Sequence, residues 1–375
     1  MKARSNYGID MGRANGISCV TGGNTRKARV ARLCVPIIIL AMLLSFMGGC
    51  RTSAPAGGGS TREAPAPVVP APPQETFTWP FTGEETGDPF AVRNVPLSVK
   101  IENSEAARPQ TGLNAADVVY ETMVEGGETR FNCIFQSRLP GEVGPVRSAR
   151  LSDLWIVPQY QGLFFYSGAN VDVVRRIKEA GLPDMSHSAA SAIYHRVSFR
   201  AAPHNLYLKL NGGHDIASAK GMTVRSDKLS PLDFGPIKSD SSVTASAITL
   251  NFGGRSNIRW DWNAEQGVYL RSQGGKALMD AMEDSQVRAK NVAVLYADYA
   301  QQPTLDPAGS PTYDTTLGGT GKAVLFREGN KYECTWTADR NTPPKLTDAA
   351  GNPIPLNPGR SWFEVLPARG SLQTE

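Results

Sequence analysis

Alternation of apolar and polar side chains marks the first strands of this chain. Residues 96–103 alternate in this way, which predicts a strand with one buried face. Two further apolar segments, 116–127 and 130–137, meet at the Gly-Gly pair 126–127. Because paired glycines allow a tight reversal of the backbone, we expect these two segments to form a β-hairpin.

Helical spacing follows between residues 147 and 181. Apolar side chains of the segment 147–157 share one helical face, and Pro158 is expected to end that helix. Residues 162–169 are continuously apolar, as in a buried strand. The segment 170–181 has the pattern of a helix that begins at a capping Asn and ends at a Gly. This succession of strands and helices predicts a central sheet with crossover connections.

Beyond residue 243 the pattern contains strands only. The short polar segments NAEQG and EGN indicate hairpin turns between some of them. The predicted strands are 246–252, 257–263, 267–272, 291–298, 321–328 and 331–337. We therefore expect the α+β fold class: an N-terminal mixed α/β domain with a central sheet and flanking helices, followed by a smaller, mostly-β domain.

The N-terminal segment has the features of a bacterial export signal. Four basic residues within 26–32 precede an apolar run from Leu33 to Met47, and Gly-Gly-Cys follows. A basic region, a short apolar region and small residues before a cysteine resemble a lipobox. We expect cleavage before Cys50 and a lipid such as palmitate on the mature N-terminal cysteine, which anchors the chain at the extracytoplasmic face of the cell membrane. An uncleaved N-terminal anchor is the alternative.

Composition sets the domain boundaries. Residues 51–77 are rich in Pro, Ala, Gly and Ser and bury too little apolar surface to fold. A second polar stretch, at 225–242, separates the mixed region from the strands. The predicted parts are a signal peptide (1–49), a lipidated Cys with its tether (50–78), an N-terminal domain (79–228), a linker (229–243), a C-terminal domain (244–369) and a tail (370–375).

The formal net charge of +4 does not indicate a nucleic-acid partner. Residues 1–50 hold seven of the 39 Lys and Arg residues and one acid, so the rest of the chain is slightly acidic. Of the five cysteines, only Cys133 and Cys334 lie beyond Cys50. We expect two separate buried thiols, and a disulfide in an exported protein is the alternative.

Several longer motifs resemble one family. PLSVKIENSEAARPQTGLNAADVVYETMVEGGETRF, GPVRSAR and RAAPHNLY are similar to the first domain of the YerB-like bacterial lipoproteins. GTGKAVLFREGNKYECTWT and GNPIPLNPGRSWFEVLP are similar to the second domain. The resemblance covers residues from about 94 to 367. It implies an extracytoplasmic, lipid-anchored protein of two domains, in a family without an established biochemical activity.

Charged and amide side chains gather in the motifs of the first domain, and we expect them to line one ligand or catalytic cleft. Arg147 and Arg150 lie three residues apart at a predicted helix start, where two guanidiniums can hold a phosphate or a carboxylate. Cations at that position need a compensating anion, which is either a ligand or a nearby carboxylate. The candidates are Glu102, Asn103, Glu121, Glu125, Arg130, Arg147, Arg150, His195, Arg196, His204 and Asn205.

The glutamates allow two interpretations. Glu121 and Glu125 lie four apart on one face of a predicted strand, about 13 Å from each other, too far for a direct acid/base pair. Glu102 on a neighbouring strand can lie closer to either of them, and two carboxylates flanking a bond suit glycoside hydrolysis. The alternative is a buried ionic network of these carboxylates with Arg130, Arg147 or Arg150.

Other chemistry is not indicated. The four histidines lack the spacing of a metal pair, no Cys-x-x-Cys is present, and the glycines of GGTGK lead into a strand rather than a phosphate loop. No nucleophile motif occurs. We therefore expect no metal and no cofactor. Four tryptophans of the second domain are expected in its core rather than on a sugar-stacking surface: Trp260, Trp262, Trp336 and Trp362.

Two classes of function remain. The first is a cell-envelope lipoprotein that acts as a ligand-binding or scaffolding protein through the charged cleft, with a cell-wall polymer or an envelope protein as its partner. The second is a hydrolase or transferase that acts on wall glycan or another anionic envelope polymer. In that case Glu102 or Glu121 would serve as acid/base and the arginines would orient the substrate.

Overall fold

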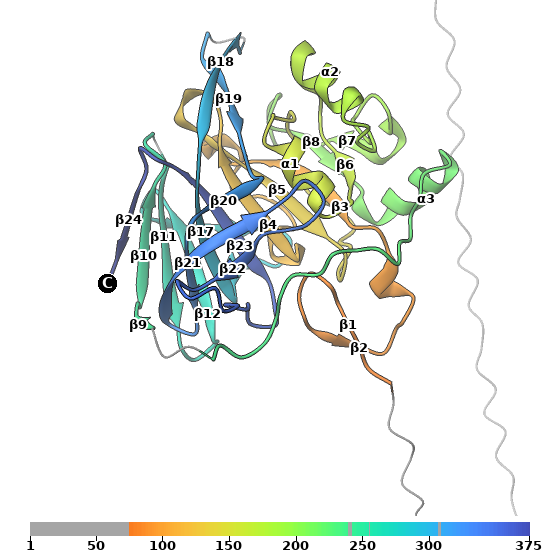
Figure 1. Ribbon diagram of the computed structural model, residues 1–375. Helices are drawn as coiled ribbons and strands as arrows, with labels where there is room; N and C mark the ends of the chain where they lie inside the picture. The colour runs from red at the N-terminus through yellow and green to blue at the C-terminus, as the bar shows by residue number, and fades with distance from the viewer. Residues whose placement is uncertain (1–74, 239–241, 255, 307–308) are drawn as a thin grey trace, which may run out of the picture. The chain divides into compact units, whose positions relative to one another are not determined.

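A large sheet runs through the described part of the chain, which in this computed structural model comprises residues 75–238, 242–254, 256–306 and 309–375. The predicted leader, Cys50 and most of the tether lie outside these residues. The ten strands follow the order β22-β21-β20-β17-β23-β4-β5-β3-β6, with β9 beside β21 (Figure 1). Their bounds are Lys345–Thr347 (β22), Asn330–Ala338 (β21), Gly319–Arg327 (β20), Asn291–Ala297 (β17), Ser361–Pro367 (β23), Val118–Met123 (β4), Thr129–Phe135 (β5), Leu97–Glu102 (β3), Leu163–Phe165 (β6) and Val243–Thr244 (β9).

A smaller sheet packs on one face of the large one. Buried side chains of both sheets, such as Trp260 and Trp362, belong to one apolar core. The strand order is β13-β12-β11-β10-β24, with β16 beside β12. The bounds are Lys276–Ala277 (β13), Val268–Gln273 (β12), Asn257–Asn263 (β11), Ala247–Asn251 (β10), Ser371–Thr374 (β24) and Arg288–Ala289 (β16). Separate strand pairs are Phe77–Thr78 (β1) with Glu85–Thr86 (β2), Tyr194–Arg196 (β7) with Leu206–Leu208 (β8), Met279–Asp280 (β14) with Ser285–Gln286 (β15), and Tyr299–Leu305 (β18) with Pro311–Thr315 (β19).

The first and second halves of the chain share the large sheet. β4 from the first half and β23 from the second are parallel neighbours, with Val118 opposite Ser361. The segment between the halves, predicted as a linker, packs against the folded residues near Pro80. Leu232 is buried, and its N–H donates to the Pro80 carbonyl over 3.0 Å. The sequence pattern predicts a strand at β4 but none at β23, so it does not reveal this pairing across the halves.

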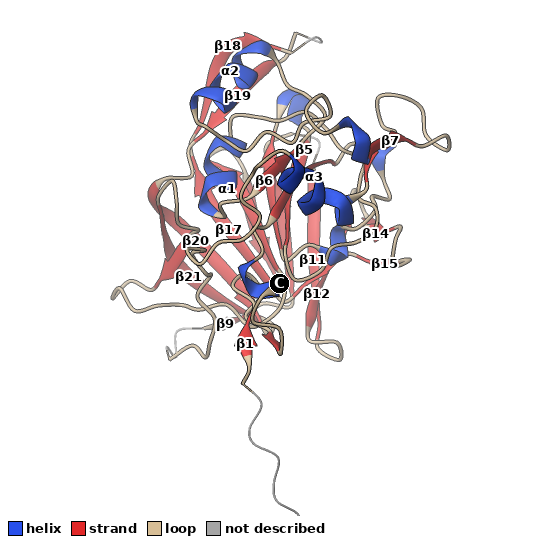
Figure 2. Cartoon of the chain, turned by 90° about the vertical axis from the view of Figure 1, so that its right-hand side faces the viewer, coloured by secondary structure: helices blue, strands red, loops and turns tan. Residues whose placement is uncertain are grey.

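The helices are few and short, as Figure 2 shows. Within the described residues the α-helices are α1 (Asp153–Gln159), α2 (Val171–Glu179) and α3 (Gly213–Ala219), and the other helices are 3-10 helices of three residues each. The predicted cap of α2 is confirmed, since the Asn170 side chain accepts a hydrogen bond from Val173 N. The prediction that the first helix stops before Pro158 is wrong, because this proline lies in the last turn, where its missing N–H costs a single backbone bond.

The core predictions for the four tryptophans are confirmed except at Trp262, which is only partly buried against the core, and the predictions for the two thiols are confirmed as well. Trp260, Trp336 and Trp362 are buried, and Cys133 and Cys334 are free, buried thiols. None of the helices within the described residues has the length and apolar character needed to cross a membrane.

Candidate functional site

Strand register divides the predicted site residues between the two faces of the large sheet. Glu102 on β3 lies opposite Arg130 on β5, so both side chains point to one face. Glu121 on β4 lies opposite Phe131, the next residue of β5, and therefore points to the other face, toward the small sheet. Because successive side chains of a strand alternate, Glu102 and Glu121 do not line one cleft. The prediction that Glu121 and Glu125 share one strand face is also wrong, since β4 ends at Met123.

Three arginines and two glutamates meet on the first of these faces, and we call this group the arginine site. Arg147 Nε lies 3.4 Å from Glu102 Oε1, and Arg150 Nη2 lies 2.6 Å from Glu125 Oε2. Arg130 donates to the Ser148 carbonyl over 3.0 Å, and Arg150 donates to the same oxygen over 3.2 Å. Within the described residues no carboxylate approaches Arg130 within 4.0 Å. Three positive groups therefore share two negative ones.

Positive charge in the arginine site faces outward. The side chains of Arg147 and Arg150 are 22% and 14% exposed, whereas those of Glu102 and Glu125 are each 4% exposed. Burial, together with the neighbouring Arg150 guanidinium, lowers the pKa of Arg130 to about 9. The carboxylates thus lie beneath the guanidiniums, and a molecule approaching from solvent meets the cations first.

Glu102 also fixes a histidine. His204 Nδ1 lies 2.9 Å from Glu102 Oε1, and Ser104 Oγ donates to the same oxygen over 2.8 Å. Glu102 Oε2 is buried and accepts no hydrogen bond from the described residues. The partly exposed His204 imidazole therefore lies beside the arginines. Glu102 can accept a further hydrogen bond through its second oxygen, Oε2.

An extended segment, rather than a helix start, places these arginines. Arg147 N donates to the Lys100 carbonyl over 2.9 Å, and Val146 N donates to the Leu206 carbonyl over 2.7 Å, so residues 146–147 lie between β3 and β8. The helix α1 begins only at Asp153, whose Oδ2 accepts from Arg150 N over 2.7 Å. The predicted helix-start clamp is therefore wrong, because strand-like contacts take up the backbone of GPVRSAR.

The remaining candidates, on or beside the β7–β8 hairpin, do not join the arginine site. His195 Nε2 lies 2.6 Å from Glu142 Oε2, and Arg196 Nη1 donates to Asn205 Oδ1 over 2.6 Å. These pairs make no hydrogen bond to the glutamates or arginines of the arginine site in the part of the chain that the structure describes. The same part contains no group of three His, Cys, Asp or Glu side chains placed to hold a metal.

Between the sheets lies a sealed group of charges, which we call the core triad: Glu121, Glu364 and Arg271. Arg271 Nη2 lies 2.7 Å from Glu121 Oε2, and its Nη1 lies 3.5 Å from Glu364 Oε1; all three side chains are fully buried. Asn103 joins this group by donating to Glu121 Oε1 over 3.1 Å. Glu121 and Asn103 thus belong to the core and are closed to an external ligand.

Sequence reasoning missed two members of the triad, although a signal was present. On β23, Glu364 occupies the position between Trp362 and Leu366 in the alternating pattern, and on β12 Arg271 follows Tyr269 in the same way. Trp362, Leu366 and Tyr269 all belong to the core. A charge at an inward position of an alternating strand indicates a buried ion pair.

The core triad makes stability depend on pH. Burial, and then the neighbouring Glu121, raises the pKa of Glu364 well above its ordinary value of 4.5. A carboxyl that binds its proton more tightly when folded stabilises the protein below the ordinary value, and this contribution is lost as the pH rises through the folded-state pKa. We expect the free energy of unfolding, measured by urea titration, to fall as the pH rises above 4.5. Glu364→Gln should flatten this dependence, and an unchanged slope in that variant would contradict the assignment.

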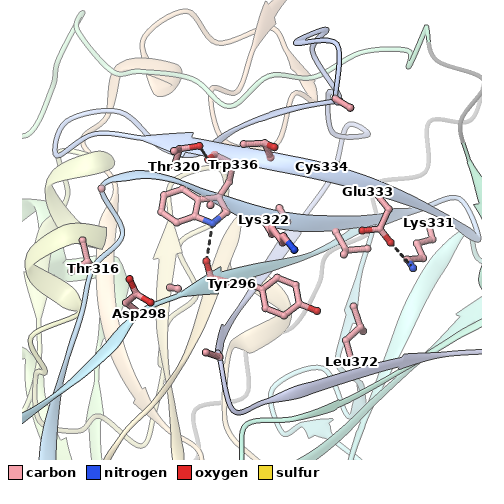
Figure 3. Close-up of a pocket in the computed structure, with 18 of the residues that line it drawn as sticks. Tyr296, Asp298, Thr316, Thr320, Lys322, Lys331, Glu333, Cys334, Trp336 and Leu372 are labelled. Atoms are coloured by element: carbon pink, nitrogen blue, oxygen red, sulfur yellow. Dashed lines mark hydrogen bonds and ion pairs between the residues drawn. The ribbon is translucent and has the colours of Figure 1, made fainter.

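A hollow of about 930 Å³ lies elsewhere, against β17, β20 and β21 and beside β24 (Figure 3). Tyr296, Lys322, Glu333 and Leu372 contribute to its lining. Trp336 closes it on one side by donating Nε1 to the Tyr296 carbonyl over 3.0 Å. None of the predicted site residues lines this hollow. It belongs to the second half of the chain, apart from the arginine site.

The two halves of the chain define a protein class: each matches one domain of a family of unknown function, DUF3048. The N-terminal domain model matches residues 81–223 and the C-terminal domain model matches residues 248–363, so the chain belongs to this family. YerB of Bacillus subtilis (strain 168), which carries the name of a lipoprotein, is 30% identical over 295 residues, 77% of this chain and 86% of YerB.

The fold agrees with that relationship. The crystal structure of YerB from Bacillus subtilis superposes with a TM-score of 0.70 at 26% identity, covering 79% of this chain and 99% of that one. The family resemblance predicted from the motifs is therefore confirmed. The expected mixed α and β architecture with a strand-rich C-terminal part is confirmed as well.

Proposed function

We propose that this protein is a lipoprotein of the cell envelope that binds an anionic ligand at the arginine site. The sequence around Cys50 and the name of its Bacillus subtilis relative support a lipid anchor at the extracytoplasmic face of the membrane. An anchored protein of this kind meets wall polymers and envelope proteins, so an anionic wall polymer is the ligand that we favour.

The distribution of charge at the arginine site carries the proposal. Three guanidiniums share two carboxylates, and the carboxylates lie deeper than Arg147 and Arg150. Guanidiniums bind phosphate and carboxylate oxygens through paired, charge-assisted hydrogen bonds. The buried carboxylates orient the arginines, and the outward excess of positive charge attracts an anion.

Hydrolysis or transfer through a pair of carboxylates has less support. Such chemistry needs two carboxyl groups on either side of one bond. Glu102 and Glu121 lie on opposite faces of the sheet, and Glu121 is held by Arg271 in the core. The geometry therefore favours ligand binding or scaffolding over an enzyme that uses this pair.

Replacing Arg130 and Arg147 together by Gln tests the proposal. The probe is a soluble poly(glycerol phosphate), titrated into the full chain in mild detergent and followed by calorimetry. We expect the double variant to weaken binding at least about tenfold, because each lost charge-assisted hydrogen bond is worth about 1.5–3 kcal/mol. Wild-type affinity should also decrease with added salt.

A matched control is Arg175→Gln. Arg175 lies on α2 and pairs with Asp172 and Glu179 on the same helix, so its loss should leave affinity unchanged. Circular dichroism and thermal unfolding establish that all variants are folded. Equal affinity of the Arg130/Arg147 variant and the wild type would refute the arginine site as the binding site.

A further inference from the structure

A second group of arginines lies where the two family-matched halves meet. Arg138 comes from the first half, and Arg288 and Arg360 come from the second. We call them the junction arginines. None of them is among the site residues predicted from the sequence, because they are far apart in the chain and only the fold brings them together.

A single ion-paired glutamate serves these three cations. Glu283 Oε1 lies 3.4 Å from Arg138 Nη1, and Glu283 Oε2 lies 3.0 Å from Arg288 Nη2. Both carboxylate oxygens are thus occupied, and no carboxylate of the described residues lies within 4.0 Å of Arg360. The group therefore carries an excess of two positive charges over its ion-paired acid.

Two of the guanidiniums converge on one neutral oxygen. Arg138 Nη2 and Arg360 Nη1 both donate to the backbone carbonyl of Asn114. That carbonyl is fixed, because Asn114 is buried, its N–H donates to Asp280 Oδ2 over 2.6 Å, and its Oδ1 accepts from Arg288 N over 3.1 Å. One carbonyl dipole does not neutralise two cations.

The junction arginines also reach solvent. The Arg138 side chain is 51% exposed and that of Arg288 is 29% exposed. Arg360 lies deeper, and burial, followed by repulsion from Arg138 and Arg288, lowers its pKa to about 10. A ligand arriving from solvent can therefore contact the outer two guanidiniums, while Glu283 and Glu84 act on the innermost one only from beyond ion-pair distance.

We propose that the junction arginines bind a doubly charged phosphate group, either free phosphate or a phosphate monoester. The dianion matches the excess of two positive charges, and its oxygens suit forked guanidinium donors from several directions. A single carboxylate carries one charge and two oxygens, and leaves one cation unmatched. This site is separate from the arginine site, and its existence does not depend on the function proposed there.

Phosphorus-31 NMR with the full chain in mild detergent tests the proposal. Inorganic phosphate is titrated first, and malonate, a dianion built from two carboxylates, is the comparison. We expect saturable binding of phosphate that is at least about tenfold tighter in the wild type than in Arg138→Gln or Arg288→Gln. Malonate should displace phosphate poorly. No saturable binding, or equal binding in the variants and the wild type, would overturn the proposal.

A second arm separates two sources of the phosphate group. Soluble dihexanoyl phosphatidic acid presents a phosphate monoester on a lipid, and glycerol 3-phosphate presents the same group without acyl chains. Tighter binding of the lipid would indicate a headgroup ligand, and equal binding would indicate a small phosphate; both outcomes support the site provided that Arg138→Gln weakens them.

Two control variants show which of the two arginine groups binds phosphate. Arg175→Gln should bind phosphate as the wild type does. In the Arg130/Arg147 double variant the arginine site is disabled, and the phosphate binding that remains should still be weakened by Arg138→Gln. If the double variant loses phosphate while Arg138→Gln retains it, the dianion binds at the arginine site and the junction proposal fails. Poly(glycerol phosphate) binding that survives Arg138→Gln would show that the two sites act separately.

Discussion

Arg271→Met is expected to lower the free energy of unfolding by about 3–5 kcal/mol. The substitution leaves Glu121 and Glu364 in the core without the guanidinium that lies between them. It also removes a cation enclosed by the rings of Phe131, Trp260 and Trp362, whose centroids lie 5.5, 5.5 and 5.1 Å from its Cζ. Methionine fills much of the volume, so the loss reports mainly on charge. Urea unfolding followed by tryptophan fluorescence measures it.

Two further variants make this experiment decisive. Adding Glu121→Gln to Arg271→Met removes one of the stranded carboxylates and should restore part of the stability. Arg259→Met changes an arginine on the same sheet whose side chain is 39% exposed, and should cost less than about 1 kcal/mol. Equal losses for Arg271→Met and Arg259→Met would show that the core triad contributes little.

The second large effect is expected for Asp153→Asn. Asp153 Oδ1 lies 2.8 Å from Lys100 Nζ, and both side chains are fully buried. The same carboxylate accepts from Asn132 and from the backbone of Arg150. Burial already lowers the pKa of Lys100, and without its partner the ammonium is stranded. We expect a loss of about 3–5 kcal/mol in urea unfolding.

This substitution should also weaken the arginine site, because the single acceptor oxygen of the amide cannot replace both carboxylate oxygens, one of which holds the backbone of Arg150. Adding Lys100→Met to Asp153→Asn removes the stranded ammonium and should recover stability without recovering poly(glycerol phosphate) affinity. Asp172→Asn, an acid on the exposed face of α2, is the matched control. If Asp153→Asn unfolds at the same urea concentration as Asp172→Asn, the buried pair does not stabilise the fold.

Sequence reasoning predicted many of the strands because their signals are local, but it missed β23 and the strand pairs β14–β15 and β18–β19. The predicted strand 257–263 coincides with β11, and the hairpin at the Gly-Gly pair joins β4 to β5. Alternation and turn residues extend over a few positions only, and no distant contact is needed to interpret them. The last turn of α1 was not predicted, because Pro158 was expected to end the helix and instead lies within its last turn.

The arginine site was predicted only in part, because strand register and pairing between distant strands decide which side chains meet. Whether Glu121 joins Glu102 depends on which face of the sheet each side chain occupies, and the strand partners settle that. Arg271 and Glu364 reach Glu121 from the other half of the chain, and the junction arginines meet in the same way. Spacing within a motif carries no information about such contacts.

The central position of β23 bears on how the protein is made. A strand near the C-terminus is inserted beside β4, which comes from the first third of the polypeptide. In the export that we propose, β4 crosses the membrane before β23, and the β4 edge that β23 covers stays unpaired until residues 361–367 follow. Residues 361–367 are therefore needed to complete the large sheet, because β23 is the strand that joins β17 to β4.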